Sequence, residues 1–349
     1  ESAVRPVAGV DFPRTFQEFD AQFLDEAACR AYITRLRWPL GFRCPHCGSS
    51  AEAWSGSGDM LRCRGCERRT SVTAGTVFEG TRKPLRTWFL AMWFVTSQKH
   101  GASALGLQRV LGWGSYQTAW AWLHKMRRAM VRPGRERLAG VVEVDETFVG
   151  GPAEGARGRD AENKTIVVVA VEERGAAMGR IRLRRVPDAS GKSLLGFVDD
   201  AIVPGSVIHT DGWKGYEGLA THGYVHNVTN VKRSGHHAHE LLPRVHRIAS
   251  LLKRWLLGTH QGGVQFPHLD YYLDEFTFRF NRRTSGSRGL LFYRLLQQAL
   301  VTEAVSYKAL VGGKGTPEHN ESGSGSEVDS PLLDFGPVRL GAWAPNAPM

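Results

Sequence analysis

Four of the five cysteines fall into two closely spaced pairs, Cys44-Pro-His-Cys47 and Cys63-Arg-Gly-Cys66. Residues 48–62 separate the pairs, a spacing typical of structural zinc sites. Two turns of this kind can direct four thiolates at one tetrahedral Zn²⁺, at about 2.3 Å per sulfur. The pattern predicts a closed structural zinc site, with Cys29 as a small core residue outside it. Two unrelated thiol pairs are the alternative.

Acidic and apolar residues alternate in the segment Val141–Thr147, which predicts a strand with Glu143 and Asp145 on one face. Asp211 follows a second apolar run, Ser206–Thr210, directly before a glycine. Carboxylates at the ends of adjacent strands can bridge divalent cations, because Mg²⁺ prefers carboxylate oxygen and keeps several waters. Two such cations about 4 Å apart would polarise a phosphodiester. The alternatives are a solvent-facing strand residue at Asp145 and a turn residue at Asp211.

The order of the predicted elements decides whether these carboxylates can meet. Hydrophobic periodicity predicts helices and strands in the following order: helix in Phe12–Arg37, cysteine unit at Phe42–Val77, helices in Pro84–Val131, strands at Val141–Val149, Thr165–Glu172 and Gly179–Val186, helix Lys192–Ile202, strands at Ser206–Thr210 and Tyr224–Val231, and helices Leu241–Leu257 and His268–Asn281. From the first strand onward, this is the order of an RNase H-like core. In that architecture the first and fourth strands are neighbours, so Asp145 and Asp211 would meet, and the helix 241–257 would supply a third ligand.

We therefore expect a multidomain α/β protein, in which an RNase H-like mixed-sheet core follows a zinc ribbon and a helical region. The expected divisions are an N-terminal helical segment at 1–40, the zinc ribbon at 41–80, a helix-turn-helix-like DNA-binding region at 81–138, the catalytic domain at 139–311 and a disordered tail at 312–349. The tail is expected from its Gly, Ser, Pro and Glu content.

The helical middle has two interpretations. A helix at Gly101–Leu111, a glycine turn and a helix at Tyr116–Met130, with Ser115 as its cap, follow the order of a helix-turn-helix. The second helix carries polar and basic residues that could read DNA: Gln117, Thr118, Trp120, His124, Lys125, Arg127 and Arg128. The other interpretation is an ordinary helical hairpin, with Trp120 and Trp122 filling a core.

Composition makes nucleic acid the first partner to test. The 349 residues include 45 Lys and Arg against 34 Asp and Glu, for a net charge of +11. Charge alone also permits an acidic protein or a membrane surface. With 42% hydrophobic residues the chain is not broadly disordered. No apolar run reaches the roughly 18 to 20 residues of a membrane helix, and no signal peptide is evident, so we expect a cytoplasmic protein.

Five stretches resemble those of bacterial insertion-sequence transposases that join an N-terminal zinc ribbon to an RNase H-like DDE domain. The matching stretches are Phe42–Gly48, Val142–Gly151, His209–Tyr216, Leu252–His260 and Tyr272–Arg283. The resemblance implies that Asp145 and Asp211 are the first two ligands of two catalytic Mg²⁺ or Mn²⁺ ions. It places the third ligand seven residues before Lys253, where this chain has His246 instead of the usual Glu.

His246 makes the expected site D-D-H. A neutral imidazole can bind a divalent metal, but it lowers the negative charge of the site, so weaker Mg²⁺ binding and a preference for Mn²⁺ are expected. Glu240 is the fallback third ligand, although its position before Pro243 is expected to place it off the helix. The resemblance also implies that Lys253 touches a phosphate beside the scissile bond; a solvated lysine is the alternative.

The activity implied is cleavage at each end of a mobile element and transfer of the freed 3′-hydroxyl into target DNA. Partners would be terminal inverted repeats, target DNA and at least a second copy of the chain. A non-catalytic DNA-binding protein and a nuclease that cuts without joining are the alternatives. Further basic or imidazole groups are expected near DNA: Arg157, Arg159, Lys164, His236, His237, His239, Arg279, Arg282 and Arg283.

Overall fold

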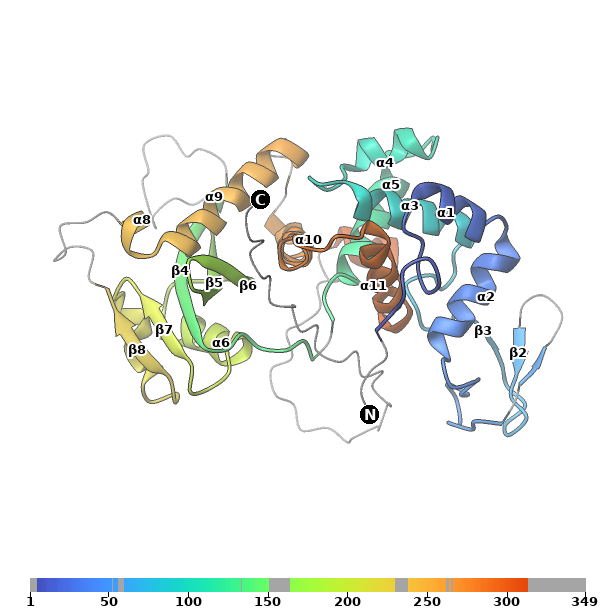
Figure 1. The fold of residues 1–349 in the computed structure, drawn as a ribbon, viewed down its shortest axis with the longest axis horizontal. Coiled ribbons are helices and arrows are strands. Elements are labelled where there is room, and N and C mark those ends of the chain that lie inside the picture. The colour runs from blue at the N-terminus through green and yellow to red at the C-terminus, as the bar shows by residue number, and fades with distance from the viewer. Residues whose placement is uncertain are drawn as a thin grey trace, which may run out of the picture.

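The structure is a computed structural model that describes residues 5–51, 53–55, 60–132, 134–150, 164–229, 238–261, 264 and 266–312. Arg157, Arg159, His236 and His237, the side chain of His239 and the tail beyond Gly312 lie outside the described residues. Figure 1 shows a large sheet at one end of the molecule and the strands of the cysteine unit at the other, with α10 and α11 between them. Among the described helices, none is long and apolar enough to cross a membrane.

The N-terminal part contains two short helices instead of one helical segment. Helix α1 (Phe16–Gln22) ends before Asp25, whose carboxylate accepts a hydrogen bond from Ala28 N at 2.8 Å and begins α2 (Glu26–Arg37). The cysteine unit then forms a small antiparallel sheet of β1 (Trp54–Ser55), β2 (Met60–Arg62) and β3 (Arg69–Ser71).

The helical part has one aromatic-rich core. Its middle helices are α3 (Leu85–Ser97), α4 (Ala104–Val110) and α5 (Tyr116–Arg128). Trp88 of α3 stacks on Trp122 of α5 with ring centroids 3.5 Å apart, and both side chains are buried. The same core includes Phe292 of α11 (Arg288–Val301), which falls within the span expected to be catalytic. The N-terminal helices, the middle helices and α11 therefore share one core.

The large sheet has the strand order β6-β5-β4-β7-β8. Its strands are β4 (Val141–Gly150), β5 (Lys164–Arg174), β6 (Ala177–Val186), β7 (Val207–Thr210) and β8 (Val225–Val228). The first three strands are antiparallel, and β7 and β8 run parallel to β4. This five-stranded mixed sheet is that of an RNase H-like core and confirms the predicted fold class.

Alternating side chains of β4 and β5 divide between two layers of helices. Val142, Val144 and Val168 pack against α6 (Gly191–Ala201) and the short helix η3 (Lys214–Leu219). Val169 and its neighbours on the opposite face pack against α9 (Pro243–His260) and α10 (Leu269–Asn281). Glu143 and Asp145 share the α9 face, as their spacing predicted. The remaining short helices are α8 (Ala238–Leu241), η4 (Phe266–His268) and α12 (Tyr307–Val311).

A buried ion pair joins the helical part to α10. Glu275 accepts a bond from Arg127 Nε of α5 at 2.8 Å and pairs with Arg279 Nη2 at 2.7 Å. The side chains of Arg127 and Glu275 are 2% and 1% exposed. Arg279 also donates to the Val95 carbonyl at the end of α3. Gly101 lies against this group with φ +84°, a left-handed conformation that suits glycine and explains the break in the helical pattern.

These contacts correct part of the DNA-reading interpretation. His124 and Arg127 are buried in the core, so neither side chain of α5 can reach a DNA groove. Arg279 is committed to Glu275, and Arg283 stacks on Phe280 and donates to its carbonyl at 3.0 Å. For His124 and Arg127 the helical-hairpin interpretation holds, whereas Arg283 is exposed and its contact with DNA stays a prediction.

Replacing Glu275→Gln is expected to lower the free energy of unfolding by about 3–5 kcal/mol at pH 7, because the buried Arg127 and the mostly buried Arg279 lose their counter-charge. Burial raises the pKa of Glu275, but Arg279 and Arg127 outweigh it and bring the pKa to about 2. The contribution of the pair is therefore complete above the ordinary pKa of a glutamate and is lost as the pH falls toward about 2.

Urea unfolding of the wild type and of Glu275→Gln, at pH 7 and at pH 3, measures the difference in their free energies of unfolding. This difference should be smaller at pH 3. The matched control is Glu18→Gln, which removes an exposed pair with Arg14 and should change little. Equal stability of wild type and Glu275→Gln at pH 7 would contradict the assignment.

Candidate functional site: a zinc ribbon and a carboxylate–imidazole cleft

The four paired cysteines converge on one point. Cys44 Sγ lies 3.7 Å from Cys66 Sγ, and Cys47 Sγ lies 3.6 Å from Cys63 Sγ. All four sulfurs lie within 4.8 Å of one another. Four sulfurs about 2.3 Å from a central Zn²⁺ form a tetrahedron with edges of about 3.8 Å. The cluster therefore fits structural zinc, and Cys29 is buried in the helical core, as predicted.

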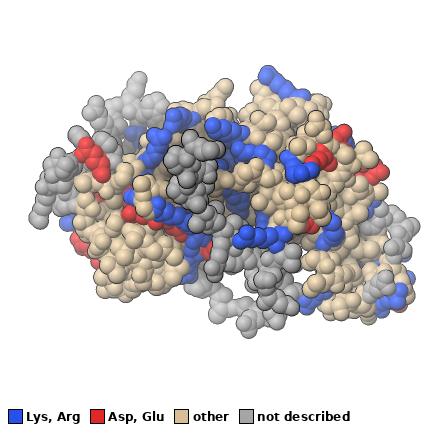
Figure 2. Space-filling view, in the orientation of Figure 1, with Lys and Arg blue, Asp and Glu red and all other residues tan. Residues whose placement is uncertain are grey.

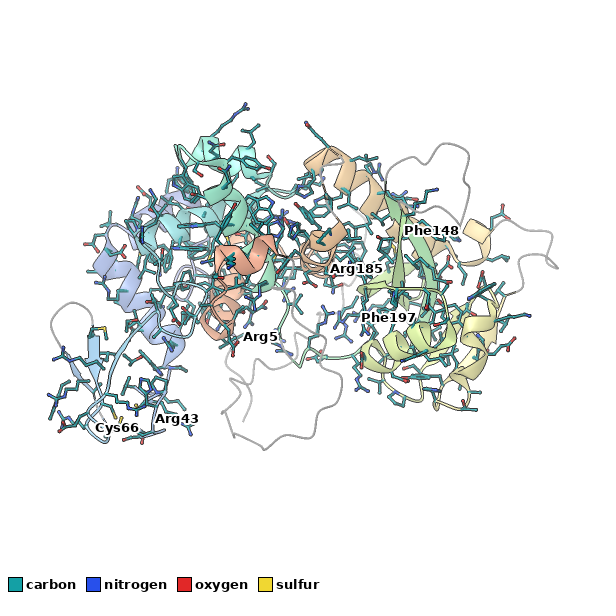
Figure 3. All side chains as sticks on the ribbon, turned by 180° about the vertical axis from the view of Figure 1, so that it is seen from behind. Arg5, Arg43, Cys66, Phe148, Arg185 and Phe197 are labelled. Carbon is teal, nitrogen blue, oxygen red and sulfur yellow. The ribbon has the colours of Figure 1, made fainter. Side chains whose placement is uncertain are left out.

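The zinc cluster lies far from the sheet. Figure 3, seen from behind, places Cys66 at the outer end of the molecule and Phe148 of β4 at the opposite end. A closed shell of four thiolates leaves no open coordination position. This part of the chain therefore does not supply the chemistry of the carboxylates.

Asp145, His246 and Lys253 line one cleft of about 230 Å³ between β4 and α9. His246 Nε2 lies 3.7 Å from Asp145 Oδ2. Lys253 lies two turns further along α9, on the same face as His246. The helix and strand thus bring together residues that are about a hundred positions apart in the chain.

Asp211 follows β7 and is aligned with Asp145 by the register of the sheet. Glu143 pairs with His209 in the parallel ladder, so the next residues on the same face are Asp145 and Asp211. Both carboxylates act on the buried Tyr216: burial, followed by the charges of Glu146, Asp145 and Asp211, raises the pKa of its hydroxyl. Asp211 also accepts a bond from Trp213 N at 2.9 Å, which holds the turn after β7.

Asp145, Asp211 and His246 do not form a closed ligand shell. Within the described residues, only the four cysteines bring three or more possible ligand atoms within 4.8 Å of one another. Glu240 lies on α8, separate from α9, as its position before Pro243 predicted. The geometry thus places His246, and not Glu240, on the helix that carries Lys253.

Glu143 has a role that the sequence did not reveal. Its carboxylate accepts bonds from the backbone N–H groups of Arg244 and Val245, at 2.8 and 3.0 Å, and from the Arg244 guanidinium at 2.6 Å. These are free N–H groups of the first turn of α9, where Leu242 provides no side-chain cap. A carboxylate on the neighbouring strand therefore caps the helix that carries His246.

Further polar residues extend this contact across the sheet. Arg244 Nη1 also lies 3.3 Å from Glu173 Oε2, and Glu173 Oε1 lies 2.7 Å from His209 Nδ1. The Glu143 side chain is 2% exposed, so its charge is balanced inside the protein. The spacing of Glu143 and Asp145, with one residue between them, was the available signal. It places Glu143 on the same face of β4 as Asp145 and nearer to the start of α9.

Two parts of the chain match known domains. Residues 24–69 match the transposase zinc-ribbon domain, and residues 137–281 match the ISXO2-like transposase domain. Both matched models describe domains of insertion-sequence transposases. The chain is also 27% identical over 288 residues, covering 74% of this chain and 91% of the relative, to an uncharacterized protein in transposable element ISH50 of Halobacterium salinarum (strain ATCC 700922 / JCM 11081 / NRC-1).

The two matched ranges contain both candidate sites. The zinc-ribbon match includes all four clustered cysteines, and the transposase-domain match runs from before Asp145 to beyond Lys253. The match ends at Asn281, just before Arg282. The predicted zinc ribbon and RNase H-like fold are thereby confirmed.

For the zinc site, Cys63→Ser is expected to reduce bound zinc from about one ion per chain to near zero, because three thiolates hold the metal poorly. Amide hydrogen exchange in residues 42–71 should become fast, while the helical core keeps its protection. Metal analysis and exchange mass spectrometry measure both effects. Cys29→Ser, which alters a buried cysteine outside the cluster, should keep its zinc; a metal-free protein with a protected ribbon would refute the site.

For the helix cap, Glu143→Ala is expected to speed amide exchange at Arg244 and Val245, because their N–H groups lose their acceptor. Glu143→Gln keeps an oxygen acceptor and should show a smaller effect. Exchange resolved to single residues, by NMR or fragmentation mass spectrometry, makes the comparison. The amides at the start of α6, which Ser190 caps, serve as the internal control. Unchanged exchange in Glu143→Ala would contradict the capping role.

Proposed function

We propose that the protein is an active DNA transposase that hydrolyses the DNA at each end of its element and joins the freed 3′-hydroxyl to target DNA. The observation that carries the proposal is the cleft in which Asp145 and His246 meet beside Lys253. The register that aligns Asp211 with Asp145 supports it. A site for phosphodiester chemistry needs such oxygen and nitrogen ligands next to a cationic group that receives the phosphate.

Asp145, Asp211 and His246 would hold divalent cations, which when bound would polarise the phosphodiester and stabilise its entering and leaving oxygens. The donor set is chemically suitable, since carboxylate oxygen and imidazole nitrogen both bind Mn²⁺, and carboxylate oxygen binds Mg²⁺. Two carboxylates and a neutral imidazole carry one negative charge less than three carboxylates. The proposed site therefore favours Mn²⁺ more than a site with Glu at position 246 would.

Lys253 positions the substrate phosphate in this proposal. Burial, followed by the nearby charge of Lys164, lowers the pKa of Lys253. The two ammonium groups thus lie close enough to repel each other, and a phosphate between them would relieve the repulsion. Lys164 begins β5, next to the end of β4, so it comes from the strand beside Asp145.

The N-terminal parts would hold the terminal inverted repeats. Because His124 and Arg127 are buried, base contacts from α5 would come from its exposed start, at Tyr116 and Gln117. In the ribbon, Arg62 and Arg64 lie over the ring of Trp54 and remain at the surface. Cutting two ends together requires at least a dimer on DNA, and a cytoplasmic protein would have access to that DNA.

The test is a strand-transfer assay with labelled terminal-repeat DNA and the full chain, in Mg²⁺ or Mn²⁺. Wild type should yield joined product, and Asp145→Ala and Asp211→Ala should yield none. His246→Ala should lose cleavage by at least about 100-fold while repeat binding remains, because a ligand is lost and the DNA contacts are not. His246→Glu should restore the missing charge and raise activity in Mg²⁺ relative to Mn²⁺.

Asp199→Ala is the matched control, because it removes an exposed carboxylate on α6 that pairs with His222 outside the cleft. Joining that survives Asp145→Ala or Asp211→Ala would refute the site. Cleavage that survives His246→Ala would move the third ligand to Glu240. Cleaved product without joining would identify a nuclease, and binding with neither product would identify a non-catalytic DNA-binding protein.

A further inference from the structure

A second cleft, of about 780 Å³, lies at the outer edge of β6, where the sheet meets the helical part. Its walls come from residues 130–132, from Arg135 and Glu136, from β6, from the end of α10 and from α11. Arginines from all of these elements line it: Arg132, Arg135, Arg180, Arg182, Arg282 and Arg294. β6 is two strands away from β4, so this cleft is distinct from the one that holds Asp145.

Positive charge exceeds negative charge in this cleft. Glu136 is the only carboxylate among the described lining residues, and it pairs with Arg180 at 2.9 Å. Glu172 lies on β5 and does not line the cleft, and it pairs with Arg180 at 2.6 Å and with Arg174 at 3.4 Å. Within the described part of the chain, Arg132 and Arg282 form no ion pair with a carboxylate. A cleft lined by uncompensated charge of one sign concentrates its potential and attracts the opposite sign.

The arginines of the cleft also lower one another's pKa. Arg182 is only 6% exposed and donates to the carbonyl of Ile181 at 2.9 Å, with no carboxylate partner among the described residues. Burial, followed by Arg135 and Arg180, lowers the pKa of Arg182 to about 9. Burial, followed by Arg294 and Arg132, lowers the pKa of Arg282 to about 10. Protein groups therefore do not fully neutralise this cluster.

Asp274, the carboxylate that acts on Arg135, compensates little of the positive charge of the cleft. Asp274 is buried on α10, and burial raises its pKa to about 7 even though Arg135 opposes the shift. At neutral pH a large fraction of this carboxyl therefore carries no charge. The cleft keeps its positive excess under physiological conditions.

Helix α11 adds hydrogen-bond donors to the same cleft. The helix has 14 residues, and Ser287 at its start makes no side-chain cap bond. Gly286, Ser287 and Leu290 line the cleft, so the positive end of the helix dipole borders it. Ser287 Oγ is buried and lacks a hydrogen-bond partner among the described residues, and its hydroxyl can donate to a phosphate oxygen. Buried polar side chains of this kind are normally satisfied, which points to a ligand.

We propose that this arginine cleft binds the phosphodiester backbone of DNA, as a contact separate from the cleavage site. The inference rests on the proposed function, since that function brings DNA to the protein. The arginines are spread over separate elements, which suits successive phosphates of a strand better than one small anion. In Figure 2, Lys and Arg also extend across the middle of the molecule, between the sheet and the helical part.

The test measures DNA affinity as a function of salt, for the full chain in an Asp145→Ala background without added Mg²⁺ or Mn²⁺. Arg132→Gln/Arg282→Gln should weaken binding of a labelled terminal-repeat duplex by at least about tenfold at 0.15 M salt. The slope of log affinity against log salt should fall by about 2, one for each lost phosphate contact. Arg282→Lys keeps the charge and should retain most of the slope.

Arg35→Gln is the matched control, because it removes an exposed arginine on α2 that does not line the cleft and should leave affinity unchanged. Because Arg282 stacks on Phe278, its replacement could unfold the protein, and thermal unfolding checks this. Arg132→Gln alone then tests the proposal, with an expected slope change of about 1. An unchanged slope, or an equal loss in Arg35→Gln, would overturn it.

Arginine modification by phenylglyoxal, read by mass spectrometry, identifies the occupant. DNA should protect Arg132 and Arg282, and inorganic tripolyphosphate at the same phosphate concentration should not. Stronger protection by tripolyphosphate would indicate a small-anion site and overturn the proposal. If DNA protects both arginines but the wild type yields no cleavage, the proposed function alone fails. If the wild type cleaves but the double variant binds normally, the cleft alone fails.

Discussion

The placement of the large sheet relative to the helical part depends on one buried carboxylate. Glu275 lies between Arg127 of α5 and Arg279 of α10, and Arg279 reaches on to backbone carbonyls at the end of α3. Because a buried charge is costly without its partners, the three side chains constrain these helices to one arrangement. Trp255 and Thr259 of α9 add a second connection by donating to the His100 carbonyl, at 2.8 and 2.7 Å. The helix that carries His246 is thus held from both of its ends.

Glu143 and Asp145, the two acidic residues of β4 that face α9, make different contacts. Both point to the α9 face of β4, but Glu143 is neutralised by the start of the helix and Arg244, while Asp145 faces the cleft. A capped helix start fixes the distance between strand and helix, and with it the separation of Asp145 and His246. Glu143 therefore supports the geometry, and the carboxylate of Asp145 remains available as the proposed metal ligand.

The sequence was informative where a short pattern determines geometry. The C-x-x-C spacing predicted the cysteine cluster, and strand alternation together with element order predicted the meeting of β4 and β7. It was misleading for Arg127, which the polar and basic residues of its helix predicted to face DNA. It was also misleading for Arg279, which was expected to contact DNA beside an apolar stripe of the same helix. Arg127 meets Glu275 across 148 positions of the chain, and no local periodicity encodes such a pairing. The capping role of Glu143 was hidden for the same reason.

A contact between Asn281 and β6, the outer strand of the sheet, limits how copies of the chain can assemble. The Asn281 side chain accepts a bond from Ile181 N at 2.8 Å and donates to Ile181 O at 3.1 Å, as an adjacent strand would do. A strand at the edge of a sheet otherwise offers these groups to any extended segment. Because β6 is already occupied at this point, a second copy cannot extend the sheet there by strand addition. Any association between copies of the chain must therefore use surfaces other than this part of β6, and the cleft that we propose binds DNA lies beside Asn281.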